Sequence, residues 1–242
     1  MLAILQKEFN SFFNSLIAYV VIGVFLVLLG LFVWVLPDGN VLDFGYADLS
    51  GFFGTAPFVF LFLLPAITMR TFAEEKKAGT IELLLTRPLS DWQLILGKYL
   101  ACVLLAVTAL VPTLLYYFTV WQLGAPQGNV DSAAVAGSYL GLVLLAATFA
   151  ALGILASAVT RDQIIAFVLA AFGCYLLYAG FDALASLNVW GRVGFFLTRL
   201  GIAYHYGTIA KGLIDSRDVL YFLSIIGLAL GATRLVLATR NW

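Results

Sequence analysis

The sequence predicts an all-α polytopic membrane protein with six transmembrane helices. Two observations predict this fold, namely a scarcity of charged residues and a series of long charge-free runs. Of the 242 residues, 63% are apolar and only 11% are charged, whereas an ordinary soluble domain has about 25% charged residues. So few charges cannot cover a water-soluble globule, and much of the exterior is therefore expected to face lipid.

The charge-free runs locate the spans, because a charged side chain at the bilayer centre costs about 2.5–3.5 kcal/mol. The predicted spans cover residues 16–36, 51–69, 99–121, 134–159, 163–183 and 219–238. Each is long enough to cross about 30 Å of hydrocarbon, with Arg234 reaching from the sixth span to the interface. The chain is expected to form a single transmembrane domain over residues 1–242.

An interfacial helix is predicted over residues 1–15, before the first span. Apolar residues recur there at helical spacing, including Leu2, Leu5, Phe9 and Phe12, with polar residues between them. This pattern is typical of an interfacial helix that lies in the inner leaflet. The polar residues in the same stretch argue against a cleaved signal peptide.

The distribution of Lys and Arg predicts the orientation, since cytoplasmic loops carry an excess of both. Bases gather before the first span and in the 70–98 segment, whereas the 37–50 loop holds acids and no base. Both termini are therefore expected in the cytoplasm. The segment 184–217 then lies outside although it carries four bases, Arg192, Arg199, Lys211 and Arg217. We expect this outer element to be helical and partly sunk in the interface, with Trp190, Tyr204 and Tyr206 at headgroup depth.

The 70–98 segment places nine charged residues in a loop rich in Leu and Ile. Gly79 and Thr80 provide a break and a helix N-cap, and Glu82 lies near the capping-box position. A short helix over 81–85 is expected to end at Arg87 and Pro88, and Ser90 with Asp91 can cap the next helix. Two readings remain open, a solvated loop with an interfacial helix or an amphipathic helix that docks into a cytoplasmic partner.

Signatures of an enzyme or a metal site are absent from the sequence. It has no G-x-x-x-x-G-K-[ST] loop, no H-E-x-x-H and no His/Cys cluster. We therefore expect no catalysis and no cofactor on this chain, and a zero net charge gives no hint of a nucleic-acid partner. The single histidine, His205, is more typical of a hydrogen-bonding interfacial residue than of a catalytic base.

The spans themselves carry few polar features. Because almost no acid or base lies inside them, an apolar or amphiphilic cargo, or transmission of force, is favoured over an ion pathway. Cys102 and Cys174 are expected to fill space as small apolar side chains. Gly137-x-x-x-Gly141 and Gly227-x-x-x-Gly231 fit either ordinary helix packing or a dimer seam.

The run EEKKAGTIELLLTRPLSDWQLILGK, residues 74–98, resembles the coupling region of ABC type-2 transporter permeases. The shared pattern is an acidic pair, Gly-Thr, an acid, a Leu run, a basic-Pro step and a closing Gly-Lys. The stretches 203–206, 211–218 and 240–242 resemble the gliding-motility-associated permeases of the GldF family. The resemblance implies six spans in a bacterial inner (cytoplasmic) membrane, an N-terminal elbow helix before the first span, a cytoplasmic coupling helix, and short outer-leaflet helices before the last span.

The resemblance also implies partners and site residues. The partners are an ABC ATP-binding subunit, which holds ATP and Mg²⁺, a second permease chain, identical or related, and membrane lipid. The expected ATPase-coupling residues are Glu74, Glu75, Gly79, Thr80, Glu82 and Arg87. Charge reversal at Glu75 is expected to leave folding unchanged, because substitutions at exposed positions rarely change stability.

The outer element offers a second set of residues, His205, Asp215, Arg217 and Asp218. A structural tie is favoured for them over a cargo site. The alternative function is an ATP-independent membrane scaffold or small channel, in which the 70–98 loop binds nothing. A membrane enzyme ranks third, because no acid/base constellation is visible.

Overall fold

The structure is a computed structural model that describes residues 1–36, 40–42, 46–80, 90–186 and 192–239. Every regular element among these residues is a helix, which confirms the all-helical class. Five helices are long and apolar enough to cross a membrane: Ser50–Lys77, Asp91–Leu123, Ser132–Val159, Gln163–Ala185 and Ser216–Ala238. A sixth span results if the pair Leu2–Asn14 and Ala18–Trp34, bent by 70°, counts as one. The six-span layout thus remains a prediction.

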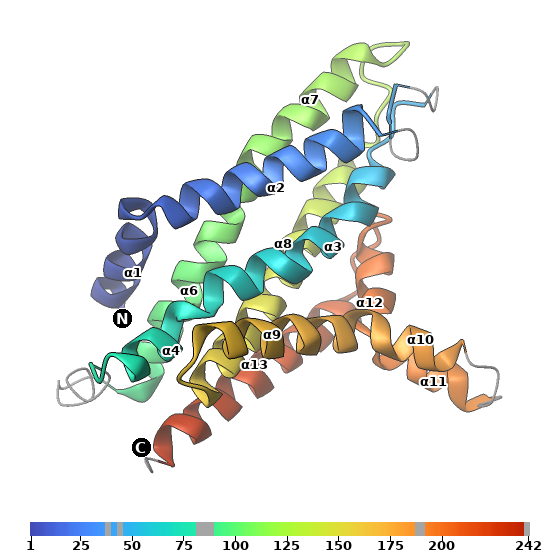
Figure 1. The fold of residues 1–242 in the computed structure, drawn as a ribbon. Helices are drawn as coiled ribbons and strands as arrows, with labels where there is room; N and C mark the ends of the chain where they lie inside the picture. Colours follow the sequence, from blue (N-terminus) through green and yellow to red (C-terminus); the bar gives the residue numbers. More distant parts are fainter. Residues whose placement is uncertain (37–39, 43–45, 81–89, 187–191, 240–242) are drawn as a thin grey trace.

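The helices follow one another in a simple order (Figure 1). The first half of the chain holds α1 (Leu2–Asn14), α2 (Leu16–Trp34), α3 (Ser50–Thr68) and α4 (Arg70–Lys77). A broken rod follows, made of α6 (Asp91–Leu110), the 3₁₀ turn η1 (Val111–Thr113) and α7 (Leu114–Leu123). Then come α8 (Ser132–Val159), α9 (Gln163–Tyr175), the π-helical turn η2 (Leu176–Gly180), α10 (Phe181–Ala185), α11 (Arg192–Leu200), α12 (Ile202–Ile209) and α13 (Ser216–Ala238).

The two ends of the bundle differ in what they hold. The N-terminus, α4 and the C-terminal end of α13 lie at one end (Figure 1). The ends of α2 and α7, together with α10, α11 and α12, lie toward the other. This arrangement puts both termini on the same side of the bundle. Which side faces the cytoplasm rests on the Lys/Arg distribution and stays a prediction.

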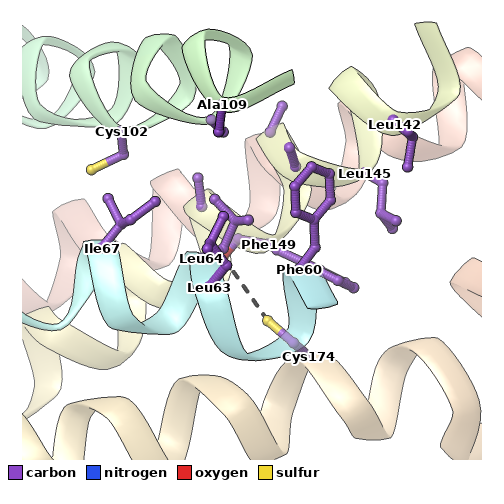
Figure 2. Close-up of a cluster of buried hydrophobic side chains, with 14 of the residues drawn as sticks. Phe60, Leu63, Leu64, Ile67, Cys102, Ala109, Leu142, Leu145, Phe149 and Cys174 are labelled. Atoms are coloured by element: carbon purple, nitrogen blue, oxygen red, sulfur yellow. Dashed lines mark hydrogen bonds between the residues drawn. The ribbon is translucent and has the colours of Figure 1, made fainter. Parts of the chain in front are cut away.

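The core is apolar and lies where α3, α6, α8 and α9 face one another (Figure 2). Phe60 of α3 stacks on Phe25 of α2 with ring centroids 5.2 Å apart. Both cysteines are free and buried, as the sequence predicted, and the Cys174 thiol points at the carbonyl oxygen of Phe149, 4.0 Å away. On the outside, α9 and α13 expose large apolar side chains such as Phe172 and Leu228, which suits contact with lipid tails.

Helix α8 approaches its neighbours most closely at glycines. A Cβ built at Gly153 would lie 2.0 Å from Oγ1 of Thr68 on α3. A Cβ at Gly141 would lie 2.9 Å from Cγ2 of Ile209 on α12, so the Gly137-x-x-x-Gly141 motif serves packing within the chain. By contrast, a Cβ at Gly227 or Gly231 would meet no heavy atom within 4 Å.

Candidate functional site

Helix α4 begins immediately after α3, and its first N–H groups are paired by a side chain from another helix. The first turn of any helix leaves N–H groups without partners inside the helix, and α4 has no side-chain cap of its own. Oγ of Ser157, near the end of α8, accepts from the N–H groups of Phe72 (3.0 Å) and Ala73 (3.1 Å). The same hydroxyl donates to the carbonyl of Met69 at 3.0 Å. Ser157 therefore acts as an N-cap supplied by α8.

A second contact ties α4 to α8. The Lys76 ammonium donates to the carbonyl oxygen of Ala158, and the Lys76 residue is only 7% exposed. A cation at the C-terminal end of a helix is favourable, because the last carbonyls carry partial negative charge. The start and the end of α4 are thus both fixed to the end of α8.

On its other side α4 meets Lys98 of α6. The Lys98 ammonium donates to Oε1 of Glu75 (2.7 Å), to the carbonyl of Thr71 (2.8 Å) and to Oε1 of Glu8 in α1 (3.2 Å). It also lies 5.3 Å from the ring centroid of Phe72. The Lys98 side chain is 1% exposed, so all three ammonium donors are used inside the protein. We call Lys98, Glu8, Glu75 and Thr71 the Lys98 junction.

Helix α1 packs on α6 next to this junction. A Cβ at Gly97 would lie 2.9 Å from Cγ2 of Ile4, so the absence of a side chain at residue 97 lets α1 approach. Ile4, Phe12 and Phe13 pack against the core. Part of the apolar face of α1 therefore meets protein, which the expectation of a helix lying in lipid had not included.

The segment that leaves α4 shows the predicted break. Gly79 has a φ of 69°, and the N–H groups of Gly79 and Thr80 bond the carbonyls of Lys76 and Glu75 at 3.3 and 3.0 Å. This is a Schellman ending, in which glycine accepts the left-handed conformation. At the far side of the loop, Ser90 forms a capping box with Gln93 and starts α6.

The coupling residues expected from the sequence fall into three groups. Glu74, Gly79 and Thr80 are exposed, and Glu82 and Arg87 lie outside the described residues. Glu75, in contrast, faces Lys98, and its side chain is 15% exposed. The premise that Glu75 is an exposed position whose reversal would spare folding is wrong, because a Lys there would face the buried Lys98 ammonium.

A separate cluster forms around His205 of α12, at the other end of the bundle. Nδ1 of His205 lies 2.6 Å from Oδ1 of Asp218, and Nε2 lies 2.9 Å from the carbonyl oxygen of Arg199. The imidazole is thus held from both sides, by Asp218 of α13 and by the backbone of Arg199 in α11. The Thr208 hydroxyl donates to the second oxygen of Asp218, and the Tyr221 ring stacks on the imidazole at 3.8 Å.

The structure brings together two of the four predicted outer residues, His205 and Asp218. Asp215 is exposed and caps α13 by accepting from the N–H of Arg217 at 3.0 Å, and Arg217 is itself exposed. Tyr206 is 4% exposed, and its hydroxyl donates to the carbonyl of Phe53 in α3 at 2.7 Å. Its depth in the membrane stays a prediction, and Trp190 lies outside the described residues.

Sequence reasoning missed the pairing residues, namely Glu8, Lys98, Ser157, Thr208 and Tyr221. The closing Gly-Lys of the 74–98 run was the available signal, since Gly97 and Lys98 both contact α1. Within the described part of the chain, no group of three or more His, Cys, Asp or Glu side chains could hold a metal ion.

A model of a known protein family matches residues 36–192, and it describes ABC-2 family transporter proteins. The match covers more than half of the chain and includes α3, α4, α6 and α8. It leaves out α1 and the His205 cluster. Among curated proteins, none matches the chain.

Proposed function

Because the chain belongs to the ABC-2 family of transporter proteins, we propose that it is a membrane-spanning permease subunit driven by a separate ATP-binding subunit. In this proposal ATP and Mg²⁺ bind to the partner, and the chain itself is not catalytic. It works beside a second permease chain, identical or related, in a bacterial inner membrane. The 70–98 region forms the cytoplasmic contact to the ATP-binding subunit.

The observation that carries the coupling role is the way α4 is held. Its buried side is fixed to α8 by Ser157 and Lys76 and to α6 by Lys98. Its exposed side carries Arg70, Glu74 and Lys77, which share one face because residues three and four apart are neighbours on a helix. A partner that pushes on this charged face would move several helices at once, because α4 is short and is bonded to both α8 and α6.

The coupling role is tested by reversing one charge on that face. Glu74→Lys is expected to lower ATP hydrolysis, or to weaken binding of the ATP-binding subunit, in purified complexes. The abundance and melting temperature of the chain should stay unchanged, because an exposed substitution rarely shifts stability by more than about 0.5 kcal/mol. Lys211→Glu is the control, since Lys211 is also exposed but follows α12, which lies toward the opposite end of the bundle from α4 (Figure 1).

Two results would contradict the coupling role. If Glu74→Lys and Glu74→Lys with Lys77→Glu both left binding and hydrolysis at wild-type level, α4 would not be the contact. If the wild-type chain bound no ATP-binding subunit at all, the ATP-independent scaffold or channel would become the better reading.

A role in gliding motility is a finer proposal that rests on sequence resemblance alone. The resembling stretches begin at residue 203, beyond the family match that ends at residue 192. Deleting the gene in its source organism should then abolish colony spreading, and normal spreading of the deletion strain would remove this proposal while leaving the permease role intact.

A further inference from the structure

We propose that Lys98 is a positioning residue that makes α1, α4 and α6 move as one unit when the ATP-binding subunit acts on the coupling region. This inference rests on the proposed function, because it concerns how a push on α4 spreads. It assigns roles to Lys98, Glu8 and Gly97, none of which belongs to the expected coupling set.

The Lys98 ammonium group connects three helices. Lys98 joins side chains or backbone from two other helices, with Glu8 on α1 and Thr71 and Glu75 on α4. A lysine that merely anchors a span would extend its charge to water. Lys98 is instead 1% exposed and reaches no solvent, so its charge serves contacts between helices.

The Lys98 ammonium separates two carboxylates that would otherwise repel each other. One ammonium faces two carboxylates whose side chains are 16% and 15% exposed. Without Lys98, Glu8 and Glu75 would share a poorly solvated site as like charges, which repel. Loss of the cation should therefore push α1 away from α4 rather than only loosen the contact.

The close packing of α1 at Gly97 is a steric contact that does not depend on charge. Gly97 precedes Lys98 and lies under Ile4 and the carbonyl of Met1, at 2.9 and 3.4 Å from the position a Cβ would take. The close approach of α1 thus requires glycine at residue 97, and it brings Glu8 within reach of Lys98. Contact by shape and contact by charge act at consecutive residues of one helix.

The other hydrogen bonds of α4 do not link it to α1. Its hydrogen bonds to α8 come from Ser157, which bonds backbone groups of α4, and from Lys76, which bonds the carbonyl of Ala158, and these bonds reach neither α1 nor α6. Among the hydrogen bonds and ion pairs of the described residues, the Lys98 junction joins α4 to α1 through a single side chain. Removing the Lys98 side chain therefore breaks the link between α4 and α1 and leaves the hydrogen bonds between α4 and α8 in place.

The experiment measures whether α1 and α4 keep a fixed distance during the ATP cycle. Spin labels are placed at Gln6→Cys on α1 and Ala78→Cys at the end of α4, both exposed positions outside the coupling set. Distances are recorded in the full complex with its ATP-binding subunit, with and without a non-hydrolysable ATP analogue. In the wild-type background the distance should be the same in both states.

Lys98→Met should lengthen the distance between the labels and make it change with nucleotide, and ATP turnover per complex should fall several-fold. The matched control is Lys7→Met, because Lys7 also pairs with Glu8, at 3.3 Å, but is 64% exposed. It should change neither readout. If Lys98→Met fails to fold, a triple variant with Glu8→Gln, Glu75→Gln and Lys98→Met replaces it, because this variant has no like-charge repulsion at the junction. The triple variant should recover part of the close approach between α1 and α4, while its ATP turnover should stay below wild type.

The outcomes separate the two levels of the argument. If the wild-type distance itself changes with nucleotide, or if Lys98→Met keeps a fixed distance and full turnover, Lys98 does not make the helices move together. A lower melting temperature with unchanged distances and turnover would mean a structural role only, which also overturns the proposal. If the wild-type chain forms no complex with the ATP-binding subunit, the proposed function fails, while the distances in the isolated chain still report whether Lys98 holds α1 against α4.

Discussion

Alanine at Gly153 is expected to force α3 and α8 apart. The new Cβ would lie 2.0 Å from Oγ1 and 2.9 Å from Cβ of Thr68, both closer than real side chains allow. Thr68 is fully buried, and its hydroxyl donates to the carbonyl of Leu64 at 2.8 Å. The side chain cannot turn away without losing that bond, and the helices cannot separate without opening the core shown in Figure 2.

The magnitude follows from these two costs. Overpacking a close-packed core costs about 1–3 kcal/mol, and the loss of one buried hydrogen bond adds about 1 kcal/mol. The free energy of unfolding, measured by denaturant titration in mixed detergent micelles, should therefore fall by about 2–4 kcal/mol. Thr68→Ala should relieve part of the loss, because it removes the hydroxyl that the new Cβ would strike.

Gly173→Ala provides the matched control for this prediction. Gly173 also lies inside an apolar helix, α9, but a Cβ there would meet no heavy atom within 4 Å. Alanine is the better helix former by up to about 1 kcal/mol, so stability should be unchanged or slightly higher. Equal stability of the Gly153→Ala and Gly173→Ala proteins would refute the close contact between α3 and α8.

Two further substitutions test single contacts by the same unfolding assay. Ser157→Ala should cost about 1–2 kcal/mol, because it removes the capping hydroxyl that accepts from the N–H groups of Phe72 and Ala73. Ser224→Ala, whose exposed hydroxyl only bonds its own helix, should stay within about 0.5 kcal/mol of wild type, and equal losses would argue against capping by Ser157. Asp218→Asn should cost about 1–3 kcal/mol, because it disturbs the buried hydrogen bonds that the Asp218 carboxylate forms with His205 and Thr208. Asp215→Asn should be near neutral because Asn caps helices as well as Asp, and equal effects of these two would contradict the role of these buried hydrogen bonds.

Local features of this fold could be predicted from sequence because they depend on neighbouring residues. The charge-free runs gave helices, since an apolar stretch in lipid must satisfy its backbone internally. Gly79 ends α4 and Ser90 begins α6, because turn and cap chemistry act over three or four residues. The all-helical membrane class follows from the same short-range rules.

Contacts between distant residues could not be predicted in this way. His205 was expected to form hydrogen bonds, but nothing in the sequence identified Asp218 and the Arg199 carbonyl as its partners. Tyr206 was expected at headgroup depth because aromatic residues gather there, and this depth stays a prediction. Nothing in the sequence indicated that its hydroxyl bonds the carbonyl of Phe53, 153 residues earlier in the chain, because that contact depends on how α12 packs against α3 and α8.

Lys98 shows why a motif can be recognised before its role is understood. In the sequence it served as evidence for a cytoplasmic loop and as the end of the closing Gly-Lys of the 74–98 run. In the structure it is buried, and Gly97 beside it admits α1. A glycine followed by a lysine thus encodes two requirements of one contact, close approach and a neutralising charge, with a helix 90 residues away in the sequence. A substitution at either residue should therefore disturb the position of α1 first, and the coupling region only through it or through Glu75.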